Sequence, residues 1–327
     1  MRQNQKTNHE THSQSIEEIS SNWKTQAELF RDRCKSLGLL DFASNFDLKV
    51  YDTVFWNLHD SSNMSHIQCK CCSGEATIIG LADFNKSCHD RHGKPAFSPS
   101  DISVPYHRCT SCGFIFSTYC DSWEAKHFAG HIYNVDYEKA DGIIPGFEEG
   151  KNDPKKSISY MNGQNLISQL GITPDQGLKI LDFGSGGNPG LTGLAFLDHG
   201  FNLQSYEPYL NETATNVGNQ LFDVIYAIEV IEHMVDLEEA IHFFDKHLSN
   251  NGLLYIQTGI HPHPAGKEIM NSWYIAPRNG HFSIFTQRAL EKLFEHAGIN
   301  IVTTTAGIFG FKDKPNFENS IMTPVKR

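Results

Sequence analysis

In the C-terminal half of the chain, short apolar runs alternate with segments of helical periodicity. The apolar runs lie at residues 178–184, 201–208, 222–228 and 252–258. Short β-rich runs of this kind predict buried strands, and strands separated by helices predict parallel pairing. We therefore expect residues 157–327 to form an α/β domain with a Rossmann-like, doubly wound sheet.

The N-terminal half has a different pattern. Residues 1–15 are polar, offer almost nothing to bury and predict a disordered tail. Apolar positions at helical spacing predict an N-terminal helical segment within residues 16–65. Cysteines and turn residues then predict a small module at residues 66–140, and the charged stretch with Gly and Pro at residues 141–156 predicts a linker.

The first strand of the C-terminal half ends in a glycine-rich turn, D-F-G-S-G-G-N, at residues 182–188. Glycines at such a turn let the backbone approach a ligand, and the following helix N-terminus offers free N–H groups. Glu207 ends the second strand, 25 residues after Asp182, where a carboxylate can accept hydrogen bonds from both ribose hydroxyls. Together the turn and this acid predict a nucleoside-binding site.

This loop resembles motif I of the class I S-adenosylmethionine-dependent methyltransferases. The order and spacing of segments from Leu178 to about Gly310 also resemble that superfamily. The resemblance implies S-adenosylmethionine as the cofactor, in contact with Asp182, Gly184, Ser185, Gly186, Gly187, Glu207 and Glu229. One departure is that only about 14 residues separate Glu207 from Phe222, where the usual fold places a third strand with an acidic residue near the adenine.

Two C-x-x-C pairs lie in the predicted module, at Cys69 and Cys72 and at Cys109 and Cys112. Two such knuckles can close a tetrahedral thiolate site around a structural zinc, and Cys71 is an alternative ligand. The simpler interpretation is a set of buried free thiols. The segment is similar to the zinc-binding module that precedes the catalytic domain in sugar C-methyltransferases, which implies a carbohydrate acceptor.

Glu229, Glu232 and His233 follow the strand at residues 222–228, and His281 precedes a predicted helix further on. The carboxyl edge of a parallel sheet is where open α/β folds bind ligands. In one interpretation, His233 or Glu232 is a catalytic general base. In a purely structural interpretation, Glu229 caps the helix and His233 makes a structural hydrogen bond.

A third interpretation assigns a divalent cation to Glu229, Glu232, His233 and His281. The pattern is similar to that of the small-RNA 3′-end and ubiquinone-pathway O-methyltransferases, whose metal holds the target hydroxyls. The aromatic loop at residues 261–278 is a candidate substrate lid, and Tyr133 and Tyr137 are candidates to reach the methyl-donor site from the linker side.

The net charge and the hydropathy of the sequence argue against two classes of partner, nucleic acids and membranes. The net charge is −11 and no run of Lys and Arg forms a stripe, so bulk binding of nucleic acid is not expected. The start is polar and no window approaches a membrane span, so we expect a cytoplasmic protein without membrane partners. The expected function is methylation of a small-molecule or glycan substrate, a sugar or glycan precursor. The alternatives are a metal-dependent O-methyltransferase of a quinone or RNA 3′ end and a non-catalytic S-adenosylmethionine-binding module.

Overall fold

The structure is a computed structural model that describes residues 67–142, 152–207, 216–262 and 267–313. The predicted tail, the predicted N-terminal helices and most of the predicted linker lie outside the described residues. None of the described helices combines the length and the apolar character that crossing a membrane requires.

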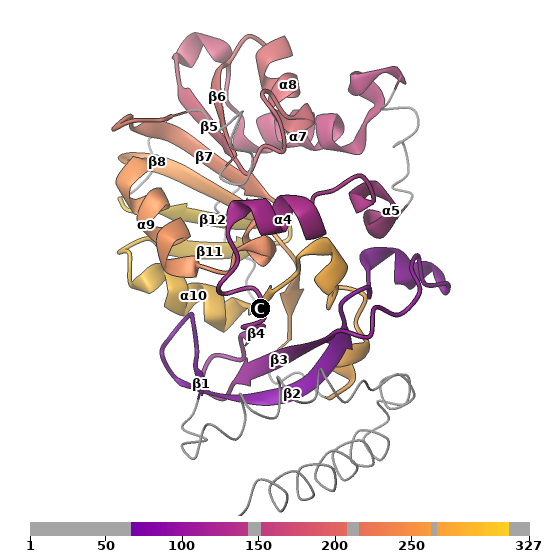
Figure 1. Cartoon of the computed structure of the whole chain (residues 1–327). Coiled ribbons are helices and arrows are strands. Elements are labelled where there is room, and N and C mark those ends of the chain that lie inside the picture. Colours follow the sequence, from indigo (N-terminus) through magenta and orange to yellow (C-terminus); the bar gives the residue numbers. More distant parts are fainter. Residues whose placement is uncertain (1–66, 143–151, 208–215, 263–266, 314–327) are drawn as a thin grey trace, which may run out of the picture.

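The C-terminal half is built on a six-stranded sheet with the order β11-β12-β8-β7-β5-β6 (Figure 1). Its strands are β5 (Lys179–Phe183), β6 (Asn202–Tyr206), β7 (Phe222–Ile228), β8 (Leu248–Gln257), β11 (Asn300–Thr304) and β12 (Gly307–Phe311). The four predicted strands, β5 to β8, are present and pair in parallel, whereas β12 and β11 add an antiparallel edge. The last predicted strand starts earlier than its apolar run, at Leu248, because that residue pairs with Phe222 across an irregularity in the ladder.

Helices cover both faces of this sheet (Figure 1). They are α7 (Ile158–Leu170), α8 (Leu191–Asp198), α9 (Leu237–His247) and α10 (Gln287–Glu295). Successive strand residues point to opposite faces, so Ile180 packs in one core with Leu166 of α7, and Leu181 packs in another with Phe244 of α9. This arrangement agrees with the predicted α/β architecture.

Side-chain caps fix where the helices begin, and these positions frame the carboxyl edge of the sheet. Ser157 accepts a hydrogen bond from the Tyr160 N–H at the start of α7, and Asp236 and Thr286 cap α9 and α10 in the same way. A cap of this type stabilises a helix by about 1 kcal/mol.

A second six-stranded sheet joins the cysteine-rich segment to the C-terminal half. Its order is β1 (Ile67–Gln68), β2 (Glu75–Asp83), β3 (Ser103–Cys109), β4 (Ile115–Phe116), β10 (Ser283–Thr286) and β9 (Ile260–His261). Ile284 of β10 pairs with Ile115 of β4. The Tyr106 hydroxyl also donates a 2.8 Å hydrogen bond to the His281 carbonyl. The segment predicted as a separate module therefore shares its sheet with residues from the methyltransferase half.

Shorter elements complete the described chain. The helices α4 (Ala125–His131) and α5 (Tyr137–Asp141) follow β4 in the sequence. The 3-10 turns are η1 (Cys88–His92), η2 (Pro154–Lys156), η3 (Pro174–Gln176), η4 (Ile231–His233), η5 (Lys267–Asn271) and η6 (Pro277–Asn279).

Candidate active site

The predicted nucleoside loop and its acidic partner lie side by side. Gly184 and Gly186 both have positive φ, 75° and 63°. A Cβ on Gly184 would approach Val230 Cγ1 to 2.4 Å, so the turn requires glycine there. The Gly186 N–H donates a 2.9 Å hydrogen bond to Glu207 Oε2, which joins the ends of two neighbouring parallel strands. The other predicted loop residues also lie in this turn, where the Ser185 hydroxyl donates to the Gly187 carbonyl at 2.6 Å.

Asp182 lies beneath this loop, on β5, with only 4% of its surface exposed. Burial, with a further contribution from the charge of Glu207, raises the pKa of its carboxyl to about 7. An opposite charge bound at the loop would favour the ionised form. The position therefore suits a cofactor that carries positive charge.

Glu229 directly follows β7 in a left-handed conformation, with φ of 52°. This conformation is uncommon for a residue other than glycine and concentrates at functional sites. Its N–H donates a 2.8 Å hydrogen bond to the Gln257 carbonyl. Burial and the neighbouring Glu232 raise the pKa of the Glu229 carboxyl to about 9.

Glu232 is wholly buried, on η4, and both of its carboxyl oxygens accept hydrogen bonds. The Thr258 hydroxyl lies 2.9 Å from Oε2 and the Tyr274 hydroxyl 3.0 Å from Oε1. The Tyr274 hydroxyl also accepts a 2.8 Å hydrogen bond from the Gly259 N–H. These three contacts hold the carboxyl group in one orientation.

Tyr274 belongs to the loop that the sequence predicts to be a substrate lid. Residues 274–278 are instead buried, and Arg278 donates to the Ile132 carbonyl at 2.9 Å. Trp273 is 43% exposed. The buried part of this loop forms a wall of the site, because Tyr274 and Ile275 pack in the core of the second sheet with Tyr106.

His233 and His281 come together from distant parts of the sequence. Their ring centroids are 4.9 Å apart, and both side chains are buried. The His281 Nδ1 lies 2.9 Å from the Tyr274 carbonyl, so Nδ1–H donates to it and Nε2 keeps its lone pair. The Nδ1 atom of His233 has no hydrogen-bond partner among the described residues.

Burial lowers the pKa of both imidazoles, so both are neutral at physiological pH. Glu232, His233 and His281 each offer one ligand atom, and these three atoms lie within 4.8 Å of one another. The donor set and the unpaired Nδ1 of His233 fit a divalent cation. Of the four predicted ligands, Glu229 is not a member of this group.

Further residues contact this site from the cysteine-rich half. The ring of Tyr133 lies 6.2 Å from that of His233 and 5.3 Å from that of Tyr137, as centroid distances, which is consistent with the predicted approach from the linker side. Cys88 Sγ lies 3.9 Å from His281 Nδ1. Neither Cys88 nor Thr258 was singled out from the sequence, because neither belongs to a motif.

The four predicted cysteine ligands form a compact cluster. Sγ of Cys69 lies 3.6 Å from Sγ of Cys112, and Sγ of Cys72 lies 3.5 Å from Sγ of Cys109. A tetrahedral zinc with Zn–S bonds of about 2.3 Å separates its sulfurs by about 3.8 Å, so the spacing fits. The Ser111 and Cys112 N–H groups donate to Sγ of Cys109, at 3.3 and 3.4 Å. The alternative ligand, Cys71, is not in the group of four.

Residues 159–304 match the family model described as a methyltransferase domain. The chain is similar to the solved structure of DesVI from Streptomyces venezuelae, with 13% identity, 51% of this chain and 95% of that chain covered, and a TM-score of 0.36. It is also similar to S-adenosylmethionine-bound CalS10, an amino pentose methyltransferase from Micromonospora echinaspora, with 13% identity, coverage of 50% and 94%, and a TM-score of 0.35. No curated protein matches. The matched domain contains the glycine-rich loop and Glu207 beside it. The chain is an S-adenosylmethionine-dependent methyltransferase.

Proposed function

We propose that this enzyme methylates a hydroxyl or a carbon of a sugar or glycan precursor, with His233 as the general base. The observation that carries the proposal is the environment of His233. Its imidazole is neutral because burial lowers its pKa, and its Nδ1 has no hydrogen-bond partner among the described residues. A neutral imidazole with a free nitrogen can accept a proton.

The proposed site has a methyl-donor side and a proton-accepting side. S-adenosylmethionine supplies the electrophilic methyl group when it is bound. Gly184 to Gly187 and Glu207 hold the donor. Burial lowers the pKa of His233, and the negative charge of Glu229 partly opposes this effect. His233 takes the proton of the acceptor, and the buried carboxyl group of Glu232, 4.0 Å from His233 Nε2, favours the positive charge that develops on the ring when it is ionised.

We also infer that Cys69, Cys72, Cys109 and Cys112 hold a structural zinc. All four positions are taken by thiolates, so the metal would have no open coordination position for chemistry. The Cys112 carbonyl accepts a 2.6 Å hydrogen bond from the Thr286 hydroxyl, which also caps α10. The zinc would therefore fix the junction between β4, β10 and α10.

A second candidate function is metal-dependent O-methylation of a quinone or an RNA 3′ end. The specific observation in its favour is the group of Glu232, His233 and His281, whose three ligand atoms lie within 4.8 Å of one another. A divalent cation held there would lower the pKa of an acceptor hydroxyl and orient it. The three residues and the neutral state of both imidazoles fit this role.

The test is methyl transfer from radiolabelled S-adenosylmethionine into a fractionated cell extract, with and without a chelator. Nucleotide-sugars and glycans are separated from lipids and RNA. Label in the sugar fraction that survives the chelator supports the proposal. Chelator-sensitive label in the lipid or RNA fraction supports the second candidate, and label confined to either of those fractions contradicts the sugar assignment.

A further inference from the structure

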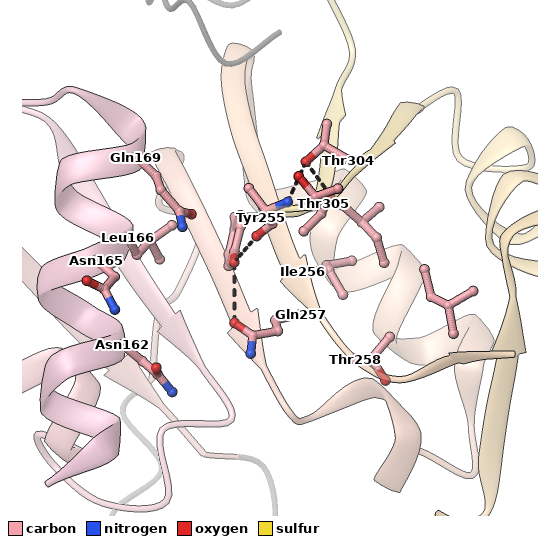
Figure 2. Close-up of a pocket in the computed structure, with 14 residues that line it drawn as sticks. Asn162, Asn165, Leu166, Gln169, Tyr255, Ile256, Gln257, Thr258, Thr304 and Thr305 are labelled. Atoms are coloured by element: carbon pink, nitrogen blue, oxygen red, sulfur yellow. Dashed lines mark hydrogen bonds between the residues drawn. The ribbon is translucent and has the colours of Figure 1, made fainter. Parts of the chain in front are cut away.

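A cavity of about 360 Å³ lies between α7, the end of β8 and the turn that joins β11 to β12 (Figure 2). Asn162, Asn165 and Gln169 line it from α7, and Figure 2 shows these amide side chains across from Tyr255 and Gln257 of β8. Its volume lies within the range of small-molecule sites. The cavity lies at the carboxyl edge of the sheet, where ligands of open α/β folds bind.

The chemistry of the lining is polar but uncharged. No acidic or basic side chain lines the cavity among the described residues. The amides of α7 and β8 and the hydroxyls of Thr304 and Thr305 can both donate and accept hydrogen bonds, while Leu166 and Ile256 add apolar surface. Such a lining suits a ligand with many hydroxyl groups and no formal charge, because a phosphate or carboxylate would lose its water without gaining a cation.

Gln169 supplies a second, independent sign of a ligand. Its Oε1 atom is buried and has no hydrogen-bond partner among the described residues. Buried polar atoms are rarely left unpaired in native proteins, so the position calls for a donor from outside the chain. Across the cavity, Tyr255 is already fixed, because its hydroxyl donates to the Ala306 carbonyl at 2.7 Å and lies 3.3 Å from Gln257 Oε1.

The cavity adjoins the proposed active site through two hydrogen bonds. Thr258 lines the cavity, and its hydroxyl donates to Glu232 Oε2 at 2.9 Å. The Gln257 carbonyl accepts from the Glu229 N–H at 2.8 Å. Only Thr258 and Gln257 would thus separate a ligand in the cavity from Glu232 and Glu229, the acidic residues near His233.

We infer that this cavity binds the uncharged, hydroxyl-rich part of the acceptor, a neutral monosaccharide unit, with Gln169 Oε1 accepting a hydrogen bond from one of its hydroxyls. The inference rests on the proposed function. It adds the site that recognises the sugar, and it specifies that this sugar unit carries no charge. Gln169 is a binding residue in this account, separate from the proton acceptor His233.

The test is binding of a panel of neutral methyl hexosides to the full chain with S-adenosylhomocysteine present, followed by ligand-observed NMR. Methyl uronides serve as charged counterparts of the same shape. Gln169→Leu is compared with Gln164→Leu, a matched change at an exposed position of the same helix that does not line the cavity. Gln169→Leu removes an unpaired buried oxygen, so the variant should remain folded, which a thermal unfolding curve checks.

We expect at least one neutral hexoside to bind, with a dissociation constant that rises about three- to tenfold in Gln169→Leu and stays unchanged in Gln164→Leu. Equal affinity in wild type and Gln169→Leu, equal binding of uronides, or no hexoside binding would overturn the inference. Methyl transfer is measured on the same panel. Hexoside binding that depends on Gln169, without methyl transfer, supports the cavity as a sugar site and contradicts the proposed function. Methyl transfer that is unchanged in Gln169→Leu supports the proposed function and contradicts the cavity as the sugar site.

Discussion

The hydroxyl of Tyr274 donates a 3.0 Å hydrogen bond to Oε1 of Glu232. The two residues are 42 positions apart, and their contact joins the loop after β8 to the acidic segment after β7. The same hydroxyl accepts from the Gly259 N–H at 2.8 Å, so one phenol connects the backbone at the end of β8 to the buried carboxyl group. The contact explains how a buried acid beside two imidazoles keeps a fixed position.

Tyr274→Phe tests this relationship. The change removes the donor to Oε1 of Glu232 and the acceptor of the Gly259 N–H, while Thr258 still donates to Oε2, so the free energy of unfolding should fall by about 1–3 kcal/mol. Denaturant unfolding measures it. Tyr119→Phe is the control, since the Tyr119 ring packs against Phe84 and Trp123 and its hydroxyl has no hydrogen bond to the described residues. Equal stability of the two variants would mean that the Tyr274 hydroxyl does not hold Glu232.

Glu207→Ala tests the nucleoside site. If Glu207 binds the ribose as proposed, the change removes the acceptor of the ribose hydroxyls and of the Gly186 N–H, so binding of S-adenosylmethionine should weaken by on the order of 1–3 kcal/mol. Isothermal titration calorimetry gives the affinity. Glu291→Ala, at an exposed position of α10, should bind the cofactor as wild type does. Unchanged affinity in Glu207→Ala would remove this residue from the cofactor site.

Cys109→Ser tests the structural zinc. Loss of one of four thiolates should release the metal and lower the unfolding temperature, because structural zinc contributes folding energy directly. Metal content is read by mass spectrometry of the purified protein. Cys71→Ser is the control, since Cys71 is equally buried but lies outside the group of four. One equivalent of zinc in Cys109→Ser, or loss of zinc in Cys71→Ser, would show that the ligand set is different.

Asp182→Asn tests the buried acid beneath the loop. Its pKa is raised from 3.8 to about 7 in the folded protein, so the folded state binds more protons between these two values. Its contribution to stability is therefore present below pH 3.8 and is lost as the pH rises through 7. The stability of Asp182→Asn relative to wild type should then increase between pH 4 and pH 8 by on the order of 2–4 kcal/mol. A difference that is constant across this range would contradict the raised pKa.

The sequence predicted the elements that have a local signal. The strands β5 and β7 are continuous apolar runs, and the glycine turn and Glu207 lie at fixed positions after their strands. The two C-x-x-C pairs predicted the cluster of four cysteines, because each pair is a local motif and two such pairs commonly bind one metal ion together. These parts depend on residues that are close in the sequence.

The parts that were missed depend on contacts between distant residues. No strand was predicted at residues 283–286, yet they form β10, in which Ile284 pairs with Ile115 of β4. Tyr274 is buried in the same core as Ile284 and Ile115. Thr258 donates to Glu232, which lies 26 positions earlier in the sequence. Periodicity carries no information about such long-range pairing.

His233→Gln tests whether His233 takes the proton of the acceptor during methyl transfer. Turnover is measured at saturating S-adenosylmethionine on the acceptor identified in the labelled extract, and cofactor affinity is measured in parallel. We predict that turnover falls by about 100-fold or more while cofactor affinity is unchanged. In wild type, turnover should fall only below the ordinary imidazole pKa, because burial lowers the pKa of His233. Turnover of His233→Gln within about twofold of wild type would contradict the claim.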